Sequence, residues 1–268
     1  MGQYYKPVFT NDDGKIIAFA HAHHVDNGLK LMEHSYVGNH LCNSVVNFLK
    51  KYPDGLHLTW AGDYADAIEK VKLDKDSEHA KEVWRQAVAD GQTELGYEAF
   101  YALDDEELFV DDPQAKNLYE IASENEDKEI AYETEDPTDA RYIINETKKE
   151  FVDMWDIISL DTWQIHPLPL LTADGNGRGG GDYYGTDLAY VGQWAGDVIR
   201  IADNLPVEST YKRIRPIFVE KNTILSALGN IEVAIKRMDY DGMSDMLSED
   251  FEKKVMEKLE EIKEALIK

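Results

Sequence analysis

The chain has 268 residues, of which 43% are hydrophobic, and it carries a formal net charge of −25. This composition predicts a folded chain of one large or two small domains and excludes an intrinsically disordered one. The charge disfavours direct contact with DNA or RNA, and no apolar stretch is long enough to span a bilayer. A single cysteine, Cys42, allows no intramolecular disulfide, and the opening residues lack the features of a signal peptide. We therefore expect a cytoplasmic protein without a cofactor that contacts neither membrane nor nucleic acid.

The chain begins with a predicted β-hairpin. Residues 4–10 and 15–23 are rich in β-forming side chains and flank the tetrapeptide "NDDG", whose Asp-Gly pair is a strong turn signal. A helix is predicted next, within residues 33–51, from the spacing of four apolar side chains: Leu41, Val45, Phe48 and Leu49.

Three histidines lie at the end of this hairpin in the run "HAHHVD". If the second strand continues through the run, His21 and His23 share one face of it. Together with Asp26 they carry the donor atoms of a partial zinc or iron site, which makes these three residues the candidate metal ligands. Alternating histidines are more typical of the half-exposed face of an amphipathic strand, and the spacing matches no established ligand motif. Surface positions are therefore the favoured alternative.

The middle of the chain carries most of the negative charge. Between Glu98 and Asp139 there are sixteen aspartates and glutamates against two lysines, a net charge of −14 within 42 residues. The densest run is "DDEE": Asp104, Asp105, Glu106 and Glu107. Such a segment keeps a protein soluble, and it also attracts a basic surface on another protein. We interpret these four residues as candidate contacts to a basic protein partner.

The second half of the chain repeats features of the first. Residues 141–154, "RYIINETKKEFVDM", predict another hairpin. Three matches relate the halves, each given as first and second copy: Asn11 and Asn145, Gly38-Asn39 and Gly175-Asn176, and Trp-Ala-Gly-Asp at residues 60–63 and 194–197. Because the matches keep their order and nearly equal offsets of 134, 137 and 134 residues, they predict an internal duplication.

These features divide the chain into four parts. We expect a first α+β repeat at residues 1–75, an acidic and partly helical insert at 76–139, a second α+β repeat at 140–205 and a helical region at 206–268. In the last region, apolar residues from Ile224 to Met238 follow a helical stripe, and another helix is predicted after Ser248. The predicted fold class is α+β, with two related hairpin-containing halves, an acidic helical insert and C-terminal helices.

A glycine-rich stretch, "LLTADGNGRGGGDYYG" at residues 170–185, is the least ordinary part of the second half. Its glycines match the pattern G-x-G-x-x-G, and residues 168–173 before them are compatible with a strand. The pattern also requires a following helix, whereas the sequence there predicts turns. Glycine amides beside Arg178 are suited to a small anion. The candidate ligand-binding residues are Asp174, Asn176, Arg178, Asp182 and Asp197.

A packed glycine turn is the alternative interpretation of this stretch. Glycine runs allow positive φ and close approach of another group, and this costs entropy that some contact must offset. Asp63 and Asp197 occur in both Trp-Ala-Gly-Asp copies, which favours a structural role for them over catalysis. Cys42 lies in the predicted helix of the first half and is interpreted as a small core residue.

Several motifs are similar to those of a known group of proteins. "MGQYY", "DNGLKLMEHS", "GNGRGGGD" and "WAGD" with the following "DYAD" resemble a family of small uncharacterised proteins from Gram-positive bacteria and their phages. In that family one short chain carries a Tyr-rich hairpin, a Gly-Leu-Lys-Leu segment, the glycine loop and then Trp-Ala-Gly-Asp. The resemblance covers residues 2–66 and 142–203. It implies an origin in a phage or mobile element and no particular activity.

The sequence therefore favours a non-enzymatic binding protein whose acidic surface engages a basic protein partner. The alternative is an enzyme or sensor that binds a small phosphorylated or nucleotide ligand at the glycine loop. In that case Arg178 contacts the anion, while Asp182, Asp197 or the histidines supply acid–base or metal chemistry. The sequence contains no Walker loop, nucleophile elbow, H-E-x-x-H or Cys-x-x-Cys motif.

Overall fold

The structure is a computed structural model. It describes residues 2–66, 116–157, 164–205 and 210–240, together with residues 255–257 and single positions between 81 and 94. The predicted partner contacts Asp104, Asp105, Glu106 and Glu107 lie outside the described residues. So do most of the predicted insert before residue 116 and most of the helix predicted after Ser248.

One mixed sheet runs through both halves of the chain. Its strands are β1 (Tyr5–Thr10), β2 (Ile16–Phe19), β3 (Leu56–Gly62), β4 (Tyr142–Asn145), β5 (Glu150–Asp153), β6 (Ala173–Asp174), β7 (Val198–Ala202) and β8 (Lys212–Arg213). They lie in the order β2-β1-β3-β7-β4-β5-β8, with β6 paired to β3 outside this path. The pairs β3–β6 and β5–β8 are parallel and the others are antiparallel.

The described residues also form helices, most of them short, so the predicted α+β class is confirmed. The α-helices are α1 (Leu31–His34), α2 (His40–Leu49), α5 (Leu118–Ser123), α6 (Pro167–Leu171) and α7 (Lys221–Tyr240). The 3-10 helices are η1 (Ala22–Val25), η2 (Glu126–Lys128), η3 (Met154–Asp156) and η4 (Leu188–Tyr190). The predicted helix of the first half corresponds to α2, in which Cys42 is fully buried.

Both predicted hairpins are present, β1 with β2 and β4 with β5. In the first turn the Asn11 Oδ1 atom accepts hydrogen bonds from the amides of Asp13 at 3.2 Å and Lys15 at 2.8 Å. In the second turn the Asn145 Oδ1 atom accepts one from the amide of Lys148 at 2.8 Å. An asparagine side chain at the end of the first strand therefore organises each turn, because its oxygen takes the place of a backbone acceptor.

The two halves share a sheet and a core. β3 and β7 pair antiparallel at the centre, and one hairpin lies on each side of them. The two Trp-Ala-Gly-Asp tetrapeptides differ in local structure, since residues 60–62 belong to β3 whereas residues 194–197 lie in turns before β7. The expectation that these tetrapeptides are equivalent positions is therefore wrong. The largest apolar cluster contains residues of both halves, from Tyr5 to Phe218.

Helices cover both faces of β1. On one face Phe9 joins the cluster that contains Leu41 and Val45 of α2. On the other face Val8 packs in a second cluster with Ala122 of α5. Successive residues of a strand point to opposite faces, so this arrangement buries the strand along almost its whole length.

The expected strand at residues 168–173 is wrong, because α6 occupies most of this segment. Pro167 lies in the first turn of α6, where a missing amide hydrogen costs nothing, and the His166 side chain caps the amide of Leu168 at 3.2 Å. Pro167 and Pro169 disfavour a central strand because they donate no ladder hydrogen bond. β6 then contains only Ala173 and Asp174.

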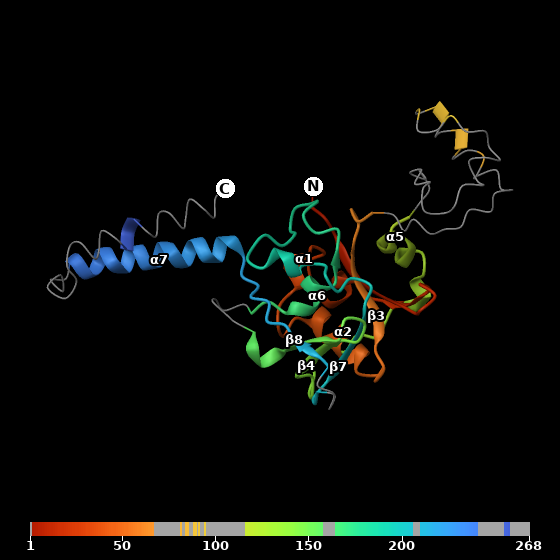
Figure 1. The fold of residues 1–268 in the computed structure, drawn as a ribbon, viewed down its shortest axis with the longest axis horizontal. Helices are drawn as coiled ribbons and strands as arrows, with labels where there is room; N and C mark the ends of the chain where they lie inside the picture. The colour runs from red at the N-terminus through yellow and green to blue at the C-terminus, as the bar shows by residue number, and fades with distance from the viewer. Residues whose placement is uncertain are drawn as a thin grey trace.

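The helix predicted from Ile224 to Met238 is confirmed as α7, which extends away from the sheet (Figure 1). Ile231 and Val233 on this helix are about half exposed. Among the helices that the structure describes, none combines the length and apolar character needed to cross a bilayer.

Candidate functional site

The glycine loop folds around its own aspartate. The carboxylate oxygen Oδ2 of Asp182 accepts hydrogen bonds from the backbone amides of Gly177 at 2.7 Å, Arg178 at 2.9 Å and Gly179 at 3.0 Å. Three convergent amides form the kind of concave site that binds anions. Here the anion is the side chain of Asp182, which is buried. The loop amides that were expected to bind an external anion are therefore already occupied.

The glycines make room for two side chains from the N-terminal half. A Cβ atom added at Gly62, Gly175 or Gly179 would lie 2.2–2.6 Å from side-chain atoms of Gln3. A Cβ atom at Gly181 would lie 2.2 Å from the Lys30 side chain. The backbone amide of Gln3 also donates to the Gly180 carbonyl at 3.1 Å. These contacts offset the entropic cost of so many glycines, and they favour the packed-turn interpretation.

Asn176 and Arg178 are likewise used within the protein. The Asn176 side chain bridges the loop, since its Oδ1 accepts from the amide of Tyr183 at 2.8 Å and its Nδ2 donates to the carbonyl of the same residue at 3.2 Å. The Arg178 guanidinium makes a bidentate pair with Asp66, with both N–O distances 2.7 Å, and donates to the Tyr64 carbonyl at 2.9 Å. The motifs "GNGRGGGD" and "WAGDYAD" therefore contact each other directly.

The other aspartates, Asp174, Asp63 and Asp197, have different surroundings. Burial raises the pKa of the Asp174 carboxyl, and the neighbouring Arg178 opposes this only in part. Asp63 Oδ1 accepts from the amide of Tyr4 at 2.9 Å, and Asp197 Oδ2 accepts from Asn145 Nδ2 at 2.8 Å. Each of these two aspartates thus ties its tetrapeptide to the beginning of its own half. This agrees with the structural role that the sequence favours for Asp63 and Asp197.

The histidine run is not the strand that the sequence suggests. β2 ends at Phe19, and residues 22–25 form η1. His21, His23 and His24 gather with ring centroids 3.9–5.4 Å apart, while Asp26 caps η1 in the left-handed region at φ 57°. Among the described residues no group of three or more His, Cys, Asp or Glu side chains is placed to hold a metal ion. The structure therefore does not assemble His21, His23 and Asp26 into a metal site.

These histidines instead contact the acidic segment, residues 116–139. His24 Nδ1 lies 2.5 Å from Glu129 Oε1, and the Tyr132 hydroxyl also bonds to Glu129. Burial lowers the pKa of His21 to about 4, with a further contribution from the charge of Lys6. His21 is therefore neutral at pH 7, which suits its position beside other rings.

α5 anchors the acidic segment to the sheet through a buried lysine. The Lys6 Nζ atom lies 2.5 Å from Ser123 Oγ and 3.8 Å from the centroid of the Tyr119 ring, and Lys6 is 1% exposed. Burial lowers its pKa to about 8. The sequence does not signal this contact, because a lysine among the apolar residues of β1 is typical of a solvent-facing position.

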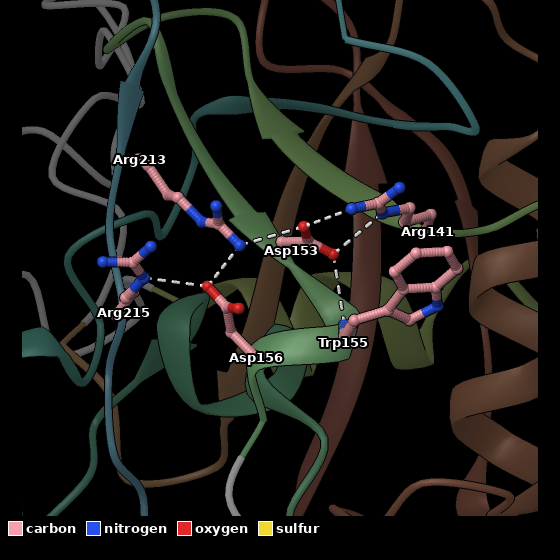
Figure 2. A network of polar contacts seen from close by, with 6 residues as sticks. All are labelled: Arg141, Asp153, Trp155, Asp156, Arg213 and Arg215. Carbon is pink, nitrogen blue, oxygen red and sulfur yellow. Dashed lines mark hydrogen bonds and ion pairs between the residues drawn. The ribbon is translucent and has the colours of Figure 1, made fainter.

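A ladder of arginines and aspartates at the edge of the sheet was also missed (Figure 2). Asp153 accepts from Arg141 Nε at 3.1 Å and Nη2 at 2.9 Å, and from Arg213 Nη2 at 3.0 Å. Asp156 pairs with Arg213 at 2.5 Å and with Arg215 at 2.9 Å. These charges come from the residue before β4, from β5 and η3, and from the segment that begins with β8. No spacing in the sequence signals that they meet.

Comparisons of the chain with protein-family models, with curated proteins and with solved structures found no match.

Proposed function

We propose that this chain is a non-enzymatic binding protein that engages a basic protein partner through its acidic surface. In the described part this surface is the acidic segment, defined as residues 116–139. It contains nine aspartates and glutamates against two lysines. The supporting observation is that backbone carbonyls supply much of the anchoring of this segment, while several of its carboxylates are exposed and unpaired.

Side chains of α2 bind the segment through its backbone. Asn43 Nδ2 donates to the Thr134 carbonyl at 3.0 Å, and Asn47 Nδ2 donates to the carbonyls of Glu133 at 3.3 Å and Glu135 at 3.2 Å. Ser44, also in α2, donates to the Glu133 carbonyl. Lys50, the residue directly after α2, donates to the Thr138 carbonyl. Two carboxylates also take part, since Asn43 Nδ2 donates to Asp136 Oδ1 at 3.0 Å and Lys51 Nζ pairs with Glu133 at 2.5 Å. Most of the acceptors for α2 and Lys50 are carbonyl groups, which leaves other carboxylates of the segment facing solvent.

Several carboxylates of the segment are exposed and unpaired. Glu126, Asp127, Glu135 and Asp139 have no ion-pair or hydrogen-bond partner for their carboxylates among the described residues. Uncompensated surface charge raises the rate at which a basic surface is encountered. This is the property that the proposed function requires.

A matched pair of charge variants tests this function. The test variant carries Glu126→Gln, Asp127→Asn and Glu135→Gln, and the control carries Asp13→Asn, Asp54→Asn and Asp203→Asn at exposed positions outside the segment. A second test variant neutralises Asp104, Asp105, Glu106 and Glu107. Each protein is used as bait in bacterial lysate at low and high salt, and captured proteins are identified by mass spectrometry.

We expect capture of a basic protein that is lost at high salt, lost in the test variants and kept in the control. Surface-plasmon resonance with that protein should show slower association with the test variants, because exposed charges act mainly through steering. Capture that is indifferent to salt and to both test variants contradicts the proposed function. Equal loss in the control points to total charge rather than to this surface, which also contradicts it.

We also propose that the two hairpin units arose by duplication, in keeping with the resemblance to a shorter phage-related family. The proposal is supported by the placement of one hairpin on each side of the β3–β7 pair, and by Asn11 and Asn145 in the two turns. The tetrapeptides no longer support it as an aligned pair. An experimental structure in which β1-β2-β3 and β4-β5-β7 do not superpose would argue against a common origin.

A further inference from the structure

The arginine–tryptophan surface, defined as Arg141, Trp155, Arg213 and Arg215, has features of a binding surface that the acidic segment does not explain. Trp155 is 76% exposed, the highest value among the large apolar side chains that the structure describes as exposed. An exposed tryptophan leaves a large apolar area in water, and tryptophan and arginine are the residues most enriched where binding energy concentrates in protein interfaces.

The tryptophan is held in a fixed position. Its backbone amide donates to Asp153 Oδ1 at 3.2 Å, and the Arg141 guanidinium lies 3.6 Å from the centroid of its ring. Asp153 is 2% exposed and is itself held by Arg141 and Arg213. Figure 2 shows this ring beside Arg141, at one end of the ladder. A side chain that is already ordered loses less entropy on binding.

The arginines retain donors for a partner. A guanidinium has five N–H donors. The Nε–H group of Arg215 donates to Asp156, and its side chain is 66% exposed. Its Nη groups have no acceptor among the described residues. Arg213 contacts both aspartates through Nη2, and its Nε and Nη1 groups also have no acceptor among the described residues. Because the aspartates fix the two guanidiniums, these donors are positioned in advance.

The local charge indicates which partner fits. Three arginines and two aspartates give the ladder a net charge of +1, and residues 209–219 contain three basic and no acidic side chains. Asp156 and Arg215 also line a small hollow whose other walls are apolar: Val152, Ile157, Ile165, Pro167, Pro216 and Phe218. The surface thus combines spare cationic donors with apolar contact area. The net charge of −25 repels a nucleic-acid polyanion, whereas a short carboxylate-bearing segment meets mainly the local field.

We propose that the arginine–tryptophan surface binds an acidic peptide segment of a partner protein. Carboxylates of the partner's peptide pair with the Nη groups of Arg215 and Arg213, and an apolar side chain of that peptide packs on the ring of Trp155. This surface shares no residue with 116–139, so it is a second binding site and does not depend on the function proposed above.

Fluorescence anisotropy with a labelled synthetic peptide, EEDFEELE, tests the proposal on the full chain. Two control peptides separate the contributions: QQNFQQLQ lacks the charges and EEDGEEGE lacks the apolar side chains. The oligonucleotide (dT)8 serves as a phosphate polyanion. The test variants are Trp155→Ala and Arg215→Gln, and the matched controls are Tyr184→Ala, another exposed aromatic residue, and Lys15→Gln, another exposed basic residue.

We expect EEDFEELE to bind, and each control peptide and each test variant to weaken binding about tenfold, as is usual for removal of a central contact. Tyr184→Ala, Lys15→Gln and the Glu126, Asp127, Glu135 variant should bind as the wild type does. Thermal melts check that the variants are folded. If Trp155→Ala does not fold, Arg215→Gln still tests the proposal. Absence of binding, wild-type affinity in both test variants, or equally tight binding of (dT)8 would overturn the proposal.

Discussion

The hydroxyl of Tyr5 in β1 donates to the carboxylate of Asp182 at 3.1 Å, although the two residues are 177 positions apart in the chain. The same carboxylate receives the three amides of the glycine loop. Asp182 therefore joins the first strand of the sheet to the loop, and it makes the loop part of the folded core. Burial, followed by the charge of Asp182, raises the pKa of Tyr5, so this hydroxyl stays protonated as a donor.

Replacing Asp182 with Ala should lower the free energy of unfolding by about 3 kcal/mol or more, because three amides and a hydroxyl lose a charged acceptor. Tyr5→Phe removes one of these bonds and should cost about 1 kcal/mol. Urea unfolding of both single variants and the double variant measures the coupling between the residues. A cost for Asp182→Ala below that for Tyr5→Phe would show that the carboxylate does not organise the loop.

Gly179→Ala should destabilise the protein by about 1–3 kcal/mol, since the added methyl group overpacks a filled space. Its Cβ would lie 2.5 Å from the Gln3 Cβ and 2.7 Å from the Gln3 backbone nitrogen, neither of which moves easily. Gly229→Ala in α7 is the control, because nothing lies within 4 Å of the added atom. In a helix that change should stabilise by about 0.5–1 kcal/mol. Equal thermal shifts for the two variants would contradict the packing described for the loop.

Gln3→Met should leave stability unchanged or raise it by about 1 kcal/mol. The Gln3 side chain is fully buried, and neither polar atom has a hydrogen-bond partner among the described residues. Methionine has a similar shape and removes the cost of desolvating the amide. Chemical denaturation of the two proteins measures the difference. A clear loss of stability would mean that the amide has a polar partner, such as a bound ligand in the glycine loop.

The free energy of unfolding should fall as pH is lowered from 6.5 toward 4. Burial lowers the pKa of His34 to about 4, against an ordinary value of 6.5, and it has the same effect on His166. Between these values the unfolded chain binds protons that the folded chain does not, so stability rises with pH through the window and is lost on acidification. The geometry agrees, because His34 Nε2 accepts from the Trp60 indole at 2.8 Å and its Nδ1 donates to the Gly28 carbonyl at 2.9 Å.

Urea unfolding at pH 7, 6 and 5 measures this dependence. His34→Gln should reduce the slope of stability against pH, whereas His40→Gln, at an exposed position, should preserve it. Identical slopes in the wild type and His34→Gln would show that His34 is not held in its neutral form. The window between pH 6.5 and 5 is informative because paired carboxylates, such as Glu146 with a pKa of about 2, begin to contribute only in stronger acid.

Local signals in the sequence determined the hairpins, α2 and α7. The turn residues Asn11 and Asn145 act on amides two to four positions away, so nearby sequence is sufficient to specify them. The apolar stripe of α7 is likewise a property of neighbouring turns. α6 was missed because its five residues are too short for periodicity, and Pro167 was a better signal than the apolar run around it.

Only the tertiary structure decided what the unusual residues do. The glycine loop has the same composition as an anion-binding loop, but the presence of Gln3 and Lys30 in the spaces it offers depends on β1 pairing with β3 and on β6 joining β3. The two Trp-Ala-Gly-Asp copies have identical local sequence but different structures. Each is placed by a hydrogen bond to the end of α6: the amide of Trp60 donates to the Thr172 carbonyl and that of Trp194 to the Leu171 carbonyl. These partners are more than twenty residues away in each case. Contacts of that range depend on how the strands assemble, which no local pattern encodes.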